Sequence, residues 1–137
     1  MRVVLDTNVL VAGLLSAAGP PAWIVEAVLA GELEPVFDGA IRDEYEEVLR
    51  RPEFGLSVER VTDLLAAFDL FGFQVVAPAP WPIELPDPDD APFLATASVT
   101  ASILVTGNLR HFPRRARGGV TVLTPREFIE RLKPREA

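Results

Sequence analysis

The sequence predicts an α/β fold built around a parallel sheet. Short apolar runs rich in β-branched residues alternate with longer segments of helical periodicity along the 137 residues, and no repeat or linker interrupts them. Strands that alternate with helices are typical of βαβ units, whose strands run parallel. A chain of this length can also bury a substantial core without disulfides. We therefore expect a single domain over residues 1–137.

The first quarter of the chain is expected to form two strands and two helices. Residues 1–5 contain two adjacent valines and are typical of a short buried strand. The apolar residues 8–16 predict a helix, and the two prolines that follow suit the first turn of a second helix over residues 20–30. Residues 33–37 are the second strand candidate.

Two amphipathic helices are expected next. Apolar side chains recur at intervals of three and four residues over 39–51 and 57–71, so each segment would present one apolar face. Residues 73–76 predict a third strand. Five prolines fall within residues 77–88, which predicts an extended loop.

The last third of the chain continues the alternation. The expected elements are a helix over 89–101, a strand over 102–106, a turn at 107–108, a helical turn over 109–112, a strand over 120–123 and a helix over 124–132. The final helix has the most specific start signal. Thr124 suits the N-cap, Pro125 the first helical position, and Glu127 the acidic position of a capping box.

The composition limits the chemistry. The chain has no cysteine and one histidine, which excludes disulfides, thiolate zinc sites, cysteine nucleophiles and sites built on two histidines.

The net charge of −7 argues against nucleic acid as a partner. However, residues 1–106 carry 5 Arg against 17 acids, a net charge of −12, whereas residues 107–137 carry 8 basic residues against 3 acids, a net charge of +5. The average therefore hides a basic C-terminal quarter.

Polar side chains follow the predicted strands at the points where ligands bind in parallel sheets, beyond the carboxyl ends. They are Asp6 and Asn8 after the first strand, Thr106 and Asn108 after the fourth, and Asp87, Asp89 and Asp90 where the proline-rich loop meets a helix. Each has a structural alternative. Asp6 would serve equally well as a helix N-cap, and Asn108 as a turn or cap residue.

Helical geometry separates the acids of residues 39–51. Glu46 and Glu47 have Arg50 and Arg51 four residues later, which favours exposed ion pairs. Glu44 has no such partner and lies nearer the apolar face, so we interpret it as a functional acid at the rim of the core.

The three aspartates at the start of the 89–101 helix are also sorted by position. Acids favour helix N-termini, and Asp89 is the one expected to serve only there. Asp90 shares the apolar face of the helix and is the functional candidate, with Asp87 as possible support. His111 is compatible with the role of an acid, a phosphate contact or only a surface residue, and we favour the surface residue.

Asp6, Glu44 and Asp90 are thus three acids from separate elements that are able to meet. Oxygen ligands without a nitrogen cluster suit Mg²⁺ or Mn²⁺, and such a site performs phosphate chemistry. A strip of arginines follows the fourth strand, beside this site, and arginine suits phosphates. The strip comprises Arg110, Arg114, Arg115 and Arg117. The alternative is that these arginines only balance nearby acids.

Taken together, these segments resemble the PIN-domain family of nucleases, and more narrowly the bacterial PIN proteins that are toxins of toxin–antitoxin systems. The matching segments are VVLDTNVLVAGLL at 3–15, DEYEEVLRRPEF at 43–54, PDPDDAPFLATA at 86–97, ILVTGNLRHFP at 103–113 and VTVLTPREFIERL at the end. The resemblance covers essentially the whole chain, and its specificity comes from the order and spacing of several motifs.

The resemblance implies a three-layer α/β/α sandwich and metal-dependent cleavage of RNA. It implies that Asp6, Glu44 and Asp90 are the catalytic, metal-binding acids, with Asn8 and Thr106 as supporting polar residues. It also implies a homodimer that a small antitoxin protein inhibits. The chain departs from the family where many members have an acid in place of Asn108, which puts a second metal ion in doubt.

Two other functions compete with the ribonuclease. Asn108 and the acidic net charge are compatible with a catalytically weak or inactive module that binds RNA or protein. A strand-end aspartate is also compatible with phosphotransfer, although Asn8 stands where such phosphatases usually have a second aspartate.

The location is expected to be cytoplasmic. The N-terminus resembles a signal peptide only superficially, because Asp6 and Asn8 interrupt its apolar residues. No apolar run is long enough to predict a membrane span, so we expect no membrane partner.

Overall fold

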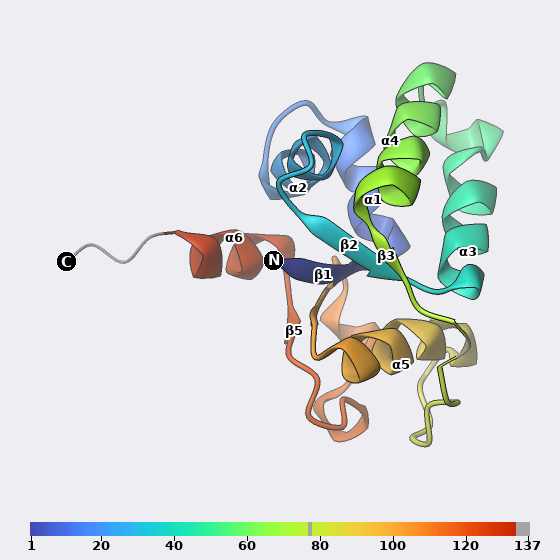
Figure 1. Ribbon diagram of the computed structural model, residues 1–137, viewed down its shortest axis with the longest axis vertical. Coiled ribbons are helices and arrows are strands. Elements are labelled where there is room, and N and C mark those ends of the chain that lie inside the picture. Colours follow the sequence, from blue (N-terminus) through green and yellow to red (C-terminus); the bar gives the residue numbers. More distant parts are fainter. Residues whose placement is uncertain (77, 134–137) are drawn as a thin grey trace.

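The computed structural model describes residues 1–76 and 78–133, and its centre is a five-stranded parallel sheet (Figure 1). The strands are β1 (Arg2–Leu5), β2 (Glu34–Phe37), β3 (Phe73–Gln74), β4 (Ile103–Val105) and β5 (Val122–Leu123). Their order in the sheet is β3-β2-β1-β4-β5, and every neighbouring pair is parallel. The predicted α/β fold with a parallel sheet is therefore confirmed.

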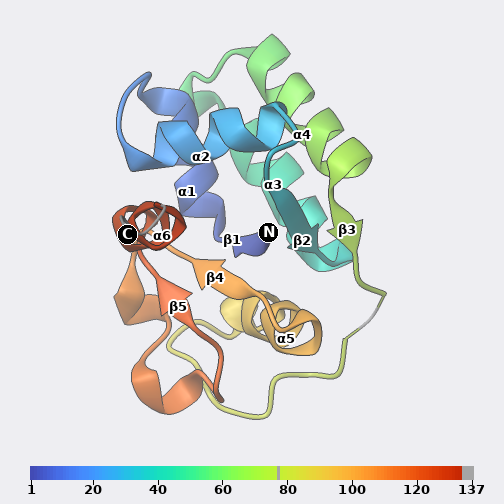
Figure 2. The same ribbon diagram turned by 60° about the vertical axis from the view of Figure 1, so that its left-hand side comes forward.

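Helices lie on both faces of this sheet. Within the described residues they are α1 (Thr7–Leu15), α2 (Pro20–Leu29), α3 (Gly39–Leu49), α4 (Val58–Phe71), α5 (Ala91–Thr100) and α6 (Pro125–Leu132). Figure 2 shows α1 to α4 together on one side and α5 on the other, while α6 packs against α2 and β5. This is the three-layer α/β/α arrangement.

The element boundaries agree with the sequence to within a few residues, with three differences. The third and fifth strands are shorter than predicted, since each has only two residues in the sheet. The helix expected over 89–101 begins as a separate 3-10 turn, Pro88–Asp90, before α5. Of the predicted 77–88 loop, residues 78–87 are irregular, and residue 77 lies outside the described residues.

The strand order reverses between β1 and β4. From β1 the chain moves through β2 to β3 on one side, whereas β4 and β5 lie on the other side. Leu5 pairs with Val105 in the register of β1 and β4, so both strands end at the same level. Ligands of open α/β sheets bind beyond the carboxyl ends at such a reversal point. The residues after Leu5 and Val105 therefore lie where a site is expected.

The core fixes α3 against the end of β1. All side chains from Val3 to Leu5 are fully buried, as expected for a central strand with helices on both faces. Tyr45 of α3 is also fully buried, packs its ring edge-on to Phe68 with 4.9 Å between centroids, and donates a hydrogen bond to the carbonyl oxygen of Leu5. Its neighbour in sequence, Glu44, is thereby held next to the carboxyl end of β1.

The packing of α1 against α2 depends on a glycine. A Cβ atom added to Gly13 would lie 2.4 Å from Cγ2 of Val25 and 2.5 Å from the carbonyl oxygen of Pro21. Only a residue without a side chain allows this approach. Because α1 begins directly after β1, this contact also fixes the helix that leads away from the candidate site.

Within the described residues, no single helix has the length and apolar character needed to cross a membrane, although α1 and α2 together pass that test as a pair bent by 98°.

Candidate metal and nuclease site

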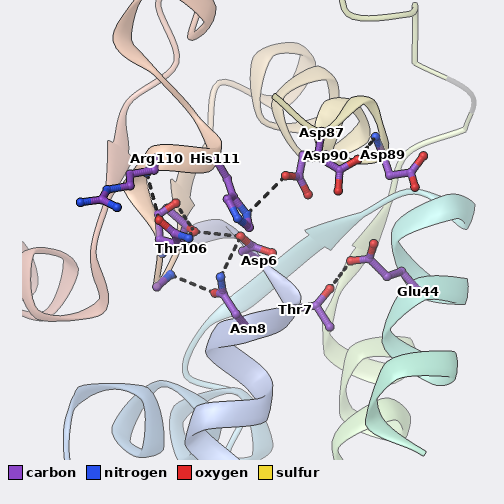
Figure 3. Close-up of polar contacts among 12 residues, drawn as sticks. Asp6, Thr7, Asn8, Glu44, Asp87, Asp89, Asp90, Thr106, Arg110 and His111 are labelled. Carbon is purple, nitrogen blue, oxygen red and sulfur yellow. Dashed lines mark hydrogen bonds and ion pairs between the residues drawn. The ribbon is translucent and has the colours of Figure 1, made fainter. Parts of the chain in front are cut away.

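A cleft of about 550 Å³ opens at the carboxyl edge of the sheet, between α1, α3 and the start of α5. Five acids and the histidine gather at its sheet end, whereas apolar side chains of α1 and α3 form the far wall. The lining residues include Asp6, Glu44, Asp87, Asp89, Asp90 and His111 on the polar side. Figure 3 shows these side chains arriving from four separate segments of the chain. The structure thus brings the predicted acids into one cleft.

Asp6 lies at the centre of the site, directly after β1. It is only 5% exposed, and its Oδ2 accepts hydrogen bonds from the Thr106 hydroxyl at 2.8 Å and from Nδ2 of Asn8 at 3.2 Å. Burial raises the pKa of the Asp6 carboxyl, and the Thr106 hydrogen bond opposes that rise. The backbone reinforces the contact, because the Asp6 amide donates to the carbonyl oxygen of Val105.

Asn8 and Thr106 both hold the junction of the two strand ends. The side-chain oxygen of Asn8 accepts a 2.9 Å hydrogen bond from the amide of Gly107. The Thr106 hydroxyl accepts one from the Asn108 amide at 3.0 Å while it donates to Asp6. Asn8 and Thr106, which were predicted as supporting residues, therefore contact the site through their hydrogen bonds to Asp6.

Glu44 approaches from α3 and is half-buried. Its Oε2 accepts a hydrogen bond from the hydroxyl of Thr7, the residue after Asp6 (Figure 3). Burial raises the pKa of Glu44, and the charges of Asp6, Asp87 and Asp89 add to the rise. By contrast, Glu46 and Glu47 form the exposed ion pairs with Arg50 and Arg51 that their spacing predicted.

Asp90 is the most strongly perturbed acid. It is only 7% exposed, and within the described part of the chain its buried Oδ2 has no hydrogen-bond partner. Burial is the largest cause, and the nearby Asp6 the next, of a rise in the pKa of Asp90 to about 7. An unpartnered buried carboxylate oxygen is costly, so it indicates a missing cation or donor.

Asp87 and Asp89 both line the cleft. Asp87, expected as support for the site, is also the N-cap of the 3-10 turn, and its Oδ1 accepts the amide of Asp89 at 2.9 Å. Asp89, expected only to cap, presents an exposed carboxylate to the cleft. The cap falls on Asp87 because the proline at position 88 starts a separate turn one residue earlier than a helix over 89–101 would begin.

His111 is a partly exposed residue that also reaches the site. Its side chain is 45% exposed, but the ring lines the cleft and Nδ1 lies 3.4 Å from Oδ2 of Asp90. The 3-10 turn Leu109–His111 carries it there. Asn108 caps this turn by accepting the Arg110 amide at 3.1 Å, so its side chain serves the backbone. The expected alternative of Asn108 as a cap residue is therefore the one observed.

The basic segment lies beside the site but not in it. Arg115 donates to the carbonyl oxygen of Glu84, and Arg117 to that of Phe112, so both hold loops in place. Among the described residues that line the cleft, none of the four predicted arginines occurs. The arginine that does line it is Arg51, which also forms its expected pair with Glu47.

The donor set fits a hard divalent cation. Asp6, Glu44 and Asp90 offer carboxylate oxygens, all three have raised pKa values, and the Oδ2 atom of Asp90 is unpartnered. Across residues 1–76 and 78–133, no three His, Asp or Glu side chains lie close enough to hold one ion as they stand. Binding would therefore require these side chains to rotate toward each other.

Two residues that organise this site were not predicted from the sequence. Thr7 and Tyr45 position Glu44 and α3 through hydrogen bonds that join segments about 40 residues apart. Thr7 lies directly after the strand-end Asp6, but its sequence position gives no indication of the contact with Glu44. His111 was considered from the sequence, whereas its contact with Asp90 was not predicted.

Comparison with known families agrees with the geometry. The family model described as "PIN domain" matches residues 2–110, which includes every acid that lines the cleft. No curated protein matches the chain.

Proposed function

This chain belongs to the PIN domain family, and we propose that it is a metal-dependent endoribonuclease. PIN domains are generally nucleases that use divalent metal ions. The observation that carries the proposal is the unpartnered, buried Oδ2 of Asp90 in a cleft shared with Asp6 and Glu44. Three acids with raised pKa values are stabilised together by a bound dication more readily than by any single side chain.

Asp6, Glu44 and Asp90 would hold the metal, which is Mg²⁺ or Mn²⁺ by donor chemistry. The chemistry supplied at such a site is activation of a water molecule and neutralisation of the charge that develops on the phosphate. The other residues act on these acids. Thr106 orients Asp6, and Thr7 orients Glu44.

RNA is the proposed substrate. Four arginines follow β4 in the chain, and the first of them, Arg110, lies near Thr106 on the side of the acids where a phosphate backbone would be neutralised (Figure 3). Of these, Arg110 and Arg114 have no side-chain hydrogen bond or ion pair to another described residue. They are the best candidates for contacts with phosphate.

The biological context is proposed from the resemblance of the motifs. The chain would be the toxin of a toxin–antitoxin system in the cytoplasm, acting as a homodimer that a small antitoxin protein inhibits. A second function is favoured by one observation. The absence of three side chains within reach of one ion, as far as the described residues extend, suits a catalytically weak module that binds RNA or protein.

The test is cleavage of single-stranded RNA by the full chain, with single-stranded DNA of the same sequence for comparison. We expect Mg²⁺ or Mn²⁺ to support cleavage, EDTA to stop it, and D6N to reduce it by at least about 100-fold, as is usual when a group that stabilises the transition state is removed. The matched control is D43N, which removes an exposed carboxylate from α3 next to Glu44.

Three results would decide between the functions. Cleavage that persists in EDTA and in D6N would overturn the metal mechanism. A folded chain that binds RNA but never cleaves it would favour the binding module. Cleavage of DNA in preference to RNA would retain the metal site and correct the substrate.

A further inference from the structure

The cleft contains one side chain, His111, that has no role in the metal site formed by Asp6, Glu44 and Asp90. The capped turn Leu109–His111 places an imidazole against Asp90, on the side of the cleft that faces Asp6. Asn108 caps this turn, and its side-chain oxygen accepts the backbone amide of Arg110. The turn that Asn108 caps therefore brings a nitrogen donor, His111, to the same cleft as the acids.

The geometry of His111 and Asp90 suits two ligands of one ion. Their nearest atoms, Nδ1 and Oδ2, are 3.4 Å apart, yet Oδ2 has no hydrogen bond to any described residue. Two ligands at about 2.1 Å from an octahedral ion, at right angles to each other, are roughly 3 Å apart. The observed spacing needs to shorten only slightly. The imidazole lies within ion-pair distance of Oδ2 without forming a hydrogen bond to it.

We propose that His111 is a nitrogen ligand of the metal site, and that the site therefore prefers a transition-metal dication such as Mn²⁺ over Mg²⁺. The inference rests on the proposed function, because it assumes that Asp6, Glu44 and Asp90 hold a metal. Mg²⁺ takes oxygen ligands and strongly favours water, whereas imidazole binds first-row transition metals. One histidine among carboxylates shifts the preference without excluding Mg²⁺.

His111 is also placed to move. Its side chain is nearly half exposed, and it stands on a single turn held by the Asn108 cap. Rotation of this ring costs less than rotation of a packed core side chain. The alternative role is that of a counter-charge, in which protonated His111 only offsets the carboxylate of Asp90. The two roles have opposite effects on metal affinity, because a protonated imidazole repels a metal ion whereas a neutral imidazole ligand binds it.

The test measures metal binding directly, on the full-length chain at pH 7.5 without RNA. Titration calorimetry gives the Mn²⁺ and Mg²⁺ affinities of the wild type, H111A, H111D and the control L109A, which alters the same turn at an exposed side chain. In parallel, pulsed EPR of bound Mn²⁺ detects a nitrogen ligand. The chain contains one histidine, so labelling histidine with ¹⁵N assigns that signal to His111.

The expected result has three parts. H111A weakens Mn²⁺ binding by at least about tenfold, as loss of a ligand or its close support does, and leaves Mg²⁺ binding unchanged within error. H111D recovers affinity but favours Mg²⁺. The Mn²⁺ signal shows a nitrogen coupling that changes with ¹⁵N-histidine, and L109A matches the wild type in every measurement.

Other results overturn the inference without ambiguity. If Mn²⁺ binds but shows no histidine coupling, His111 is not a ligand. If H111A binds either ion more tightly, His111 is a counter-charge. If D6N and the wild type both fail to bind any dication, it is the proposed metal site itself that fails, and this outcome is distinct from the first two.

Discussion

The hydroxyl of Thr106 donates a 2.8 Å hydrogen bond to the carboxylate of Asp6, although 100 positions separate the two residues in the chain. The contact exists because β1 and β4 are adjacent and in register at the point where the strand order reverses. It joins the two halves of the domain at the most buried acid of the site. The strength of this hydrogen bond therefore affects both the free energy of unfolding and the pKa of Asp6.

Replacing Thr106 by valine keeps the shape of the side chain and removes this hydrogen bond. Because the bond lowers the pKa of Asp6, T106V should raise that pKa further. We expect a loss of about 1.5–3 kcal/mol in the free energy of unfolding, as for hydrogen bonds to charged groups. The loss should be larger at pH 8, where Asp6 is ionised, than at pH 4. Urea denaturation at both pH values measures it, and T106S is the control that keeps the hydroxyl.

Asp90 should make the protein less stable as the pH rises. Its pKa is raised from 3.8 to about 7 in the folded state, so between these values the folded chain holds a proton that the unfolded chain has released. Stability is therefore expected to fall as the pH rises from about 4 to about 7, and to level off above that range. The melting temperature at pH 5 and pH 8, without divalent metal, tests the sign.

The D90N variant separates this effect from the other acids. It should be more stable than the wild type at pH 8 and should lose part of the pH dependence, with Asp6 and Glu44 responsible for the remainder. D89N, which changes an exposed carboxylate next to it, should not show this gain. A wild-type chain that becomes steadily more stable up to pH 8 would contradict the assignment.

Tyr45 is predicted to affect metal binding indirectly, because it holds α3, and with it Glu44, against the end of β1. The Y45F variant retains the packing against Phe68 but loses the hydrogen bond to the carbonyl oxygen of Leu5. Since that oxygen lies at the buried end of β1, we expect a loss of about 1–3 kcal/mol and weaker metal binding through a displaced Glu44. Calorimetric metal titration and urea denaturation measure the two effects. Metal affinity equal to that of the wild type would limit Tyr45 to a role in stability.

Ala101 offers a stabilising change away from the site. It ends α5 with φ of 51°, in the left-handed region that alanine disfavours. Glycine adopts this conformation freely, so A101G should increase the free energy of unfolding by about 1 kcal/mol. S98G, at an exposed position inside the same helix, should lower it by about 0.5–1 kcal/mol. Equal signs for the two variants would contradict the explanation.

Much of the fold was predictable because its signals are local. The capping box of α6, the paired charges of α3 and the periodicity of α4 each lie within one element, and the structure agrees with all of them. The convergence of Asp6, Glu44 and Asp90 on one cleft also followed from strand ends and helix faces. The parallel sheet then places these elements at the same edge.

What escaped prediction depends on single turns and on contacts distant in sequence. The cap of the turn before α5 falls on Asp87 because one proline starts a 3-10 turn there. The helical turn that carries His111 was predicted over 109–112, but its contact with Asp90 was not. The link between Thr7 and Glu44 spans 37 residues and leaves no trace in either local sequence. Such features require the tertiary structure.

The pairing of β1 with β4 also has a consequence for the synthesis of this chain. Asp6 is among the first residues to be made, but its partner Thr106 follows about a hundred residues later, and the sheet is incomplete until then. Contacts of such large sequence separation form late in folding. Until Thr106 has been made, a chain still being translated therefore lacks both the hydroxyl that donates to Asp6 and the strand that pairs with β1.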